Sequence, residues 1–174
     1  LTVSGHTVLS AGTVALDNAN RLDGALTLSS AGAASLRTTG ALALAGVNVG
    51  GALTLSTAGA LSDSAAVVVG GATTLSVGTG NDLVLDHAGN DFVGAVAITA
   101  ARDVTLTDAN SLSISGMVSR DVRLSSAGDV RLGTTVVGGQ FQVQASGAVA
   151  QVGSDTLTVS GHTVLSAGTV ALDN

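Results

Sequence analysis

The chain has 174 residues, 45% of them hydrophobic, with 24 glycines, no cysteine and a net charge of −6 at pH 7. All its basic residues are arginine and all its acidic residues are aspartate. An acidic chain without clustered basic side chains is a poor ligand for nucleic acid, and the lack of cysteine excludes disulfide bonds and thiolate metal sites. Gly, Ser, Thr or Asp interrupts every apolar run well short of a membrane span, so we expect no membrane insertion.

The remaining composition favours short strands joined by tight turns. Leu, Val, Thr, Ser, Ala and Gly dominate, and the mean hydropathy of +0.55 is too high for a disordered linker. Only two aromatic residues are present, Phe92 and Phe141. The core of the folded chain must therefore consist of small aliphatic side chains.

The first eighteen residues, LTVSGHTVLSAGTVALDN, return letter for letter at residues 157–174. Identity of this length does not arise by chance, and internal repeats decide how a fold is interpreted. We interpret residues 1–156 as one complete long repeat of a rod. Residues 157–174 are then the start of the next identical repeat.

A shorter period runs inside this unit. The phrase GALTLSSAGA at residues 24–33 is answered by GALTLSTAGA at 51–60, and related phrases begin at Gly71, Gly94, Arg120 and Gly139. These spacings predict coils of variable length, about 20–27 residues each. Alternating runs such as ALTLS, AASLR and ALALA between Ala25 and Ala45 predict about three short strands per coil.

Alternation of apolar and polar residues predicts which side chains face the core, because successive side chains of a strand point to opposite faces. The runs AAVVV at 65–69 and HTVL at 6–9 do not alternate cleanly, and their faces stay open. The predicted inward pairs are Leu26 with Leu28, Val96 with Ile98, Val104 with Leu106, Leu112 with Ile114, Val122 with Leu124, Val130 with Leu132, and Phe141 with Val143.

Two architectures can use such strands, an antiparallel sandwich or a parallel β-helix. A sandwich has no reason to repeat nearly the same phrase, whereas stacked coils gain from placing like on like at about 4.8 Å. Unequal spacings exclude a strict hexapeptide left-handed helix. The sequence therefore predicts an all-β fold, a right-handed parallel β-helix (solenoid).

The sharpest local signal for chemistry is the pair of Gly-Asn-Asp triplets ending at Asp82 and Asp91, nine residues apart. Nine is the spacing of calcium-binding β-roll repeats, in which Asp carboxylates supply oxygen ligands. However, only two copies exist, and Asp86-His87-Ala88 precedes the second in place of glycines. The alternative is that Asn and Asp form ordinary turns. We expect no metal or cofactor, with Asp82 and Asp91 as a weak calcium candidate.

Other polar residues give no catalytic constellation. His6 and His162 are the same repeat position, and His87 has no second histidine nearby, so a zinc site is not expected. Carboxylate groupings typical of β-helical polysaccharide enzymes are weak here, since an outward alternation of charge is typical of a solvated face. We therefore expect no enzyme activity. The groupings considered are Asp82, Asp86 and Asp91, and Asp121, Arg123, Asp129 and Arg131.

One segment resembles a known family. GNDFVGAVAITAARDVTLTDANSLSISG at 89–116 is similar to the NDF-G-V … V-L-D-N-L-L motif of filamentous-haemagglutinin-like exoproteins of bacterial two-partner secretion, which include large biofilm adhesins. GTVALDNANRLDG at 12–24 looks like a shorter variant of the motif. The resemblance implies a rigid β-helical rod that is secreted or held at the bacterial cell surface.

The leading functional hypothesis is therefore a structural stalk repeat of an adhesin, acting in adhesion, aggregation or a biofilm matrix. Its partners would be adjacent identical repeats in the same chain. Two alternatives stay open, a module that binds glycan or exopolysaccharide and a calcium-binding β-roll-like segment.

Overall fold

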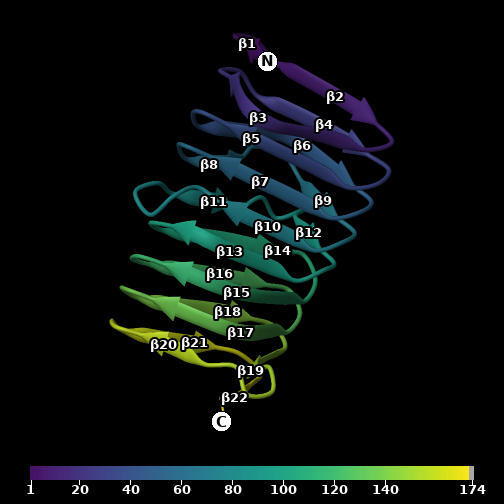
Figure 1. The fold of residues 1–174 in the computed structure, drawn as a ribbon. Helices are drawn as coiled ribbons and strands as arrows, with labels where there is room; N and C mark the ends of the chain where they lie inside the picture. Colours follow the sequence, from purple (N-terminus) through teal and green to yellow (C-terminus); the bar gives the residue numbers. More distant parts are fainter. Residues whose placement is uncertain (173–174) are drawn as a thin grey trace.

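The computed structural model describes residues 1–172 and contains only strands and turns (Figure 1). The described residues hold no helix long and apolar enough to span a membrane. The strands are β1 Thr2–Val3, β2 Thr7–Ala11, β3 Val14–Leu22, β4 Leu26–Ser30, β5 Ala34–Thr38, β6 Leu42–Val49, β7 Leu53–Thr57, β8 Leu61–Asp63, β9 Val67–Val69, β10 Thr73–Ser76, β11 Leu83–Leu85, β12 Asp91–Phe92, β13 Val96–Ala101, β14 Val104–Asp108, β15 Leu112–Val118, β16 Val122–Ser126, β17 Val130–Val137, β18 Phe141–Ala145, β19 Ala148–Gln151, β20 Leu157–Val159, β21 Thr163–Ser166 and β22 Thr169–Ala171.

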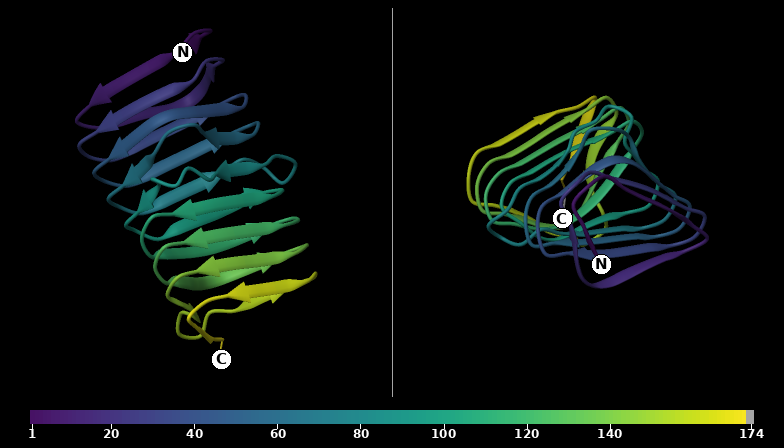
Figure 2. Two further views of the ribbon diagram at one scale, coloured as in Figure 1. Left: turned by 180° about the vertical axis from the view of Figure 1, so that it is seen from behind. Right: turned by 90° about the horizontal axis from the view of Figure 1, so that it is seen from above.

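These strands wind into a parallel β-solenoid, as the sequence predicts. Two sheets of 11 strands each run along the stack, and the strand pairs within them are parallel. Viewed along the stack, the coils overlie one another as closed loops around a common interior (Figure 2). The chain makes about nine turns of about 19 residues each. The right-handed sense stays a prediction.

The coil length varies because some turns carry extra residues. Val104 pairs with Val122, 18 residues on, whereas Thr73 pairs with Val96, 23 residues on. The 27-residue spacing of the two GALTLS phrases is therefore not one coil. Leu53 of the second phrase pairs with Ala34, so it lies under β5 rather than under β4.

The number of strands per coil also varies. The central coil of β7, β8 and β9 has three, as expected, while the coil of β16 and β17 has two. The two-strand coils close because one strand bends, and the register shifts between Ile114 and Gly116 where β15 follows this bend. Gly116 has a φ of +145°, and a Cβ there would overlap the carbonyl oxygen of Ile98. Glycine is required at this bend.

The core is a set of aliphatic ladders running along the stack. Each predicted inward pair is buried, with every member at most 4% exposed. Phe92 and Phe141 are also buried, so both aromatic rings lie inside. Burial of apolar surface is the main stabilising contribution in such a stack.

The two identical segments adopt matching structure at opposite ends of the solenoid. Residues 1–18 supply β1, β2 and the start of β3, and residues 157–172 supply β20, β21 and β22. β21 pairs with β18 and β22 with β19, so the second segment adds one further coil. That residues 157–174 begin a further full repeat stays a prediction, and residues 173–174 of it lie outside the described part.

Candidate functional site

The two Gly-Asn-Asp triplets lie in the turns around β11. Asn81 donates a hydrogen bond from Nδ2 to the carbonyl oxygen of Val77 at 2.7 Å. Asn90 is fully buried, accepts a hydrogen bond from the N–H of Val67 at 2.8 Å and donates one to Asp63 at 2.6 Å. Both asparagines thus satisfy backbone groups at bends, the role that the turn interpretation assigns to them.

The two calcium candidates have different surroundings. Asp82 forms an ion pair with Arg102, with Oδ2 2.5 Å from Nη2. Asp91 begins β12, where it pairs with Val68 of β9. Residues 1–172 contain no group of three or more His or Asp side chains placed to hold a metal ion. A calcium ion prefers six to eight oxygen ligands, which these two carboxylates alone do not supply.

Aspartates line one corner of the solenoid, just before the strands β11, β14 and β16. Asp103 accepts a hydrogen bond from the N–H of Asp121 at 3.0 Å, and Asp121 accepts one from the N–H of Gln140 at 2.7 Å. Each carboxylate therefore caps the turn of the next coil. Burial acts to raise the pKa of Asp103, but the Asp121 N–H and the guanidinium groups of Arg102 and Arg120 outweigh it and hold that pKa below its ordinary value.

Beside this aspartate corner, which comprises Asp82, Asp103 and Asp121, lies an open polar groove of about 300 Å³. Arg123 is exposed in the groove, between Thr105 and Gln142 in register. The groove lining combines hydroxyl, carboxylate, amide and guanidinium groups in rows along the stack. It is lined by Asp103, Val104, Thr105, Asp121, Val122, Arg123, Gln140 and Gln142.

The carboxylate groupings weighed for an enzyme are not brought together as one site. Asp121 precedes β16 and Asp129 follows it, so the five residues of that strand, about 17 Å, separate them. Asp129 caps the next coil by accepting a hydrogen bond from the N–H of Ala148 at 2.9 Å, and it lies 3.4 Å from Arg131. Asp86 is exposed, and its N–H donates to Asp63.

The histidines are likewise separate. His6 Nε2 lies 2.9 Å from Thr27 Oγ1, and His87 Nδ1 accepts a hydrogen bond from the N–H of Gly89 at 3.1 Å. His162 lies in the turn before β21 and accepts a hydrogen bond at its carbonyl oxygen from Phe141. No two histidines share a partner among these contacts.

Sequence reasoning missed one buried charged residue. Asp108 is 1% exposed and accepts hydrogen bonds from the N–H groups of Asn110 at 2.7 Å and Phe92 at 3.0 Å. Burial raises the pKa of Asp108, although these two hydrogen bonds lower it in part. The signal was its parity, because Asp108 follows Val104 and Leu106 at the inward positions of β14.

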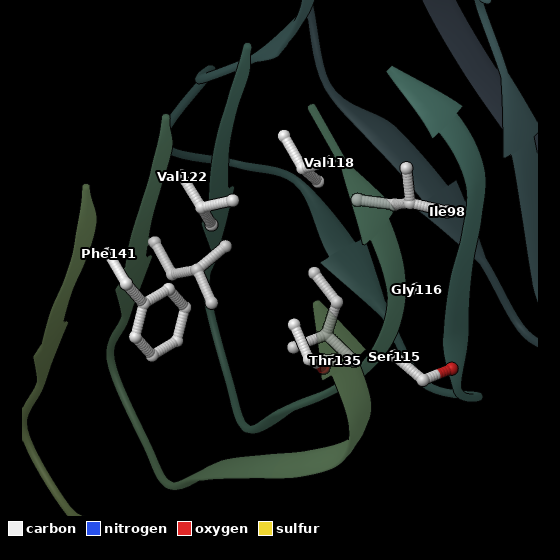
Figure 3. Close-up of a pocket in the computed structure, with 9 residues that line it drawn as sticks. Ile98, Ser115, Gly116, Val118, Val122, Thr135 and Phe141 are labelled. Atoms are coloured by element: carbon white, nitrogen blue, oxygen red, sulfur yellow. The ribbon is translucent and has the colours of Figure 1, made fainter. Parts of the chain in front are cut away.

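The interior offers no ligand site of useful size. An enclosed cavity of about 10 Å³ lies between β13, β15, β17 and β18 (Figure 3). Val118, Val122, Ile98 and Phe141 surround it, at the level where Gly116 and Thr135 interrupt the aliphatic ladder. A space this small holds one water molecule at most, and an apolar lining keeps it dry.

One family model matches the chain, described as repeats of unknown function (DUF5649), over residues 1–29, 31–99 and 119–174. The chain belongs to this family. No curated protein and no solved structure matches the chain. The tandem-repeat character inferred from the sequence therefore has a family counterpart, and the structure defines these repeats as coils of a β-solenoid.

Proposed function

We propose that this chain is a structural stalk repeat of a secreted or cell-surface bacterial adhesin and has no catalytic activity. The proposal rests on one observation above all. The same parallel stacking runs from β1 to β22, so the chain adds length coil by coil without closing around a binding site. Solenoids of this kind are extended along one axis, and nearest-neighbour contacts hold each coil in place.

The polar side chains support the same role. Asp103, Asp121 and Asp129, which an enzyme would place in a cleft, accept hydrogen bonds from the backbone of the following coil. These contacts hold coils together and limit sliding between them. The resemblance of residues 89–116 to filamentous-haemagglutinin-like exoproteins is what directs the proposal to the bacterial surface.

The test is where the parent protein lies and whether its length matters. Antibodies raised against residues 1–172 should bind intact cells of the source bacterium, and brief protease treatment of those cells should remove the signal. Removing repeats from the parent should reduce surface attachment or aggregation while secretion continues. Signal that survives protease until the cells are lysed contradicts the surface location.

A second candidate function follows from the polar groove. Rows of hydroxyl, amide and charged side chains repeat about every 4.8 Å along it, close to the rise of an extended glycan. Arg123, exposed at its centre, is the side chain most suited to an acidic exopolysaccharide. Glycan-array binding that is lost in Arg123→Ala but kept in Arg37→Ala, which lies outside the groove, would support this candidate.

A further inference from the structure

The two ends of the solenoid carry matching surfaces. The second copy of the repeated segment, residues 157–172, pairs through β20, β21 and β22 with β17, β18 and β19. We call the strand edge that receives it the β17–β19 edge. The first copy forms β1, β2 and the start of β3, and it pairs with the coil that follows it, through β3, β4 and β5.

The opposite side of the first copy is unpaired within the described residues, and we call it the N-terminal edge. Its inward side chains Val3, Leu9 and Val14 are only partly buried, because one coil covers them instead of two. On the β17–β19 edge, by contrast, Phe141 and Val143 are fully buried under the second copy. The N-terminal edge thus has the same sequence as the coil that buries them.

We propose that the N-terminal edge is a docking surface for a second copy of this chain and binds its β17–β19 edge. The register is the one that the second copy already shows, with Thr163 paired to Phe141, Leu165 to Val143 and Val170 to Val149. The corresponding pairs between two chains are Thr7 to Phe141, Leu9 to Val143 and Val14 to Val149. Two different surfaces meet, so the contact is head-to-tail and extends into a filament.

In this chain the second copy covers the β17–β19 edge from within the same molecule. A tethered segment has a high effective concentration and outcompetes a free partner. Residues 157–172 therefore act as a cap that keeps the chain monomeric. This inference goes beyond the proposed stalk function, because it depends only on the coil edges and holds wherever the protein works.

Two equivalent glycines allow docking to be blocked without disturbing the fold. Gly161 donates its N–H to the carbonyl oxygen of Gly139 at 2.9 Å, and a Cβ on Gly161 would lie 2.5 Å from that oxygen. Gly5 is the same position in the first copy, and a Cβ there meets no atom within 4 Å. A side chain at Gly5 is therefore compatible with the isolated chain and incompatible with the docked one.

The experiment frees the β17–β19 edge in the full-length chain. Val159→Asp with Leu165→Asp places two charges on the inward side of the capping coil and should release it. Light scattering after size-exclusion chromatography should then show concentration-dependent oligomers at multiples of the 16.6 kDa chain, while the wild type elutes as a monomer. Adding Gly5→Val should return the released variant to a monomer, and adding Gly40→Val, equally uncrowded, should not.

Two results would overturn the proposal. One is a released variant that keeps its β-sheet circular dichroism and yet stays monomeric at every concentration. The other is assembly that persists unchanged with Gly5→Val, which would place the contact elsewhere on the molecule.

A second measurement covers the case in which the released variant loses its fold. Gly161→Val loosens the cap more gently, and the chain has no native cysteine to interfere. Val164 pairs with Gln142, so docking places Val8 of one chain beside Gln142 of another, at a spacing that a disulfide can bridge. Chains carrying Val8→Cys should therefore form a mixed dimer with chains carrying Gln142→Cys.

Two controls accompany this cross-link. Ser10→Cys, offset by two residues, should cross-link to Gln142→Cys at least about tenfold more slowly. The double variant Val164→Cys with Gln142→Cys should oxidise within one wild-type chain. If that internal control oxidises fully while Val8→Cys and Gln142→Cys chains give no mixed dimer, the proposed docking is wrong.

Discussion

Asp121 extends into the space that Gly139 leaves empty in the next coil. A Cβ on Gly139 would overlap Asp121 Oδ1, the oxygen that accepts the hydrogen bond from the N–H of Gln140. The arrangement recurs at the next corner, where Asp129 faces Gly147 and accepts a hydrogen bond from Ala148. In both cases the glycine follows the aspartate by 18 residues, one short coil. Capping aspartate and glycine are therefore a unit of this fold.

Gly139→Ala should destabilise the chain by about 1–3 kcal/mol, because the new methyl group displaces the Asp121 carboxylate and crowds the backbone of Arg120. Gly40→Ala, where a Cβ meets no atom within 4 Å, should stay within about 0.5 kcal/mol of the wild type. Urea unfolding followed by circular dichroism measures both. Equal effects at the two glycines would contradict the pairing of Asp121 with Gly139.

The same pair can be tested for coupling. Asp121→Ala alone leaves the N–H of Gln140 without its acceptor and should cost about 1–3 kcal/mol. Because Asp121→Ala also removes the atom that Gly139→Ala would hit, the double variant should lose less than the sum of the single losses. Strict additivity would mean that the two positions act independently.

Leu28→Ala should destabilise the chain by about 2–5 kcal/mol, because Leu28 is 2% exposed in an aliphatic ladder between Leu9 and Val47. Ser29→Ala, one residue on and exposed, should change stability by no more than about 0.5 kcal/mol. Chemical unfolding compares the two directly. Similar losses would show that β4 does not present its alternate faces to core and solvent.

How far the sequence alone predicts this structure depends on whether a feature is local or lies between coils. Parity is local, so alternation identified the inward residues of β13 and β16 correctly. Register is not local. GALTLS describes one strand and its turn, and both β4 and β7 use it although they lie on different sides of the coil. Phrase similarity thus identified strands but misplaced the 27-residue spacing.

The buried polar residues show the same limit. Asn90 stands in a Gly-Asn-Asp triplet that is typical of a surface turn, yet its side chain is fully buried against Val67 and Asp63. Its partners are 23 and 27 residues away in sequence. No local pattern specifies such contacts, which exist only once the coils are stacked. The faces left open at 65–69 are now assigned, with Val67 and Val69 buried.

Val122→Ile should stabilise the chain by about 0.5–1 kcal/mol, because Val122 lines the enclosed cavity and an added methyl group can enter it. Its neighbour in the same ladder, Val104, is 1% exposed and does not line the cavity, so Val104→Ile should be neutral or destabilising. Thermal unfolding of the two variants is the measurement. A larger gain for Val104→Ile would place the packing defect elsewhere.

Two aspartates near β14 should give opposite pH dependence. The pKa of Asp103 is lowered in the folded chain, so its stabilising contribution is present above its ordinary value of 3.8 and disappears as the pH falls through the lowered value. The pKa of Asp108 is raised, mainly by burial, so the free energy of unfolding should fall as the pH rises from 3.8 through the raised value.

Urea unfolding between about pH 2 and 7 separates these contributions. Asp103→Asn should flatten the loss of stability below pH 3.8, and Asp108→Asn should flatten the decline above it. Arg120→Ala is a matched control for the first effect, because Arg120 lies 3.7 Å from Asp103 and contributes to its lowered pKa. A pH profile that neither asparagine variant alters would contradict both assignments.

Folding should be independent of calcium. Asp82 already pairs with Arg102, and the neighbouring Asn81 and Asn90 direct their amides to the backbone at the two turns. The aliphatic ladders on either side continue without a break through Leu83 and Leu85. Adding calcium or EDTA should therefore leave the circular dichroism and the unfolding midpoint unchanged, in the wild type and in Asp82→Ala with Asp91→Ala alike. A β-sheet signal that falls on chelation, returns with calcium and fails to return in that double variant would instead establish a calcium site between the two triplets.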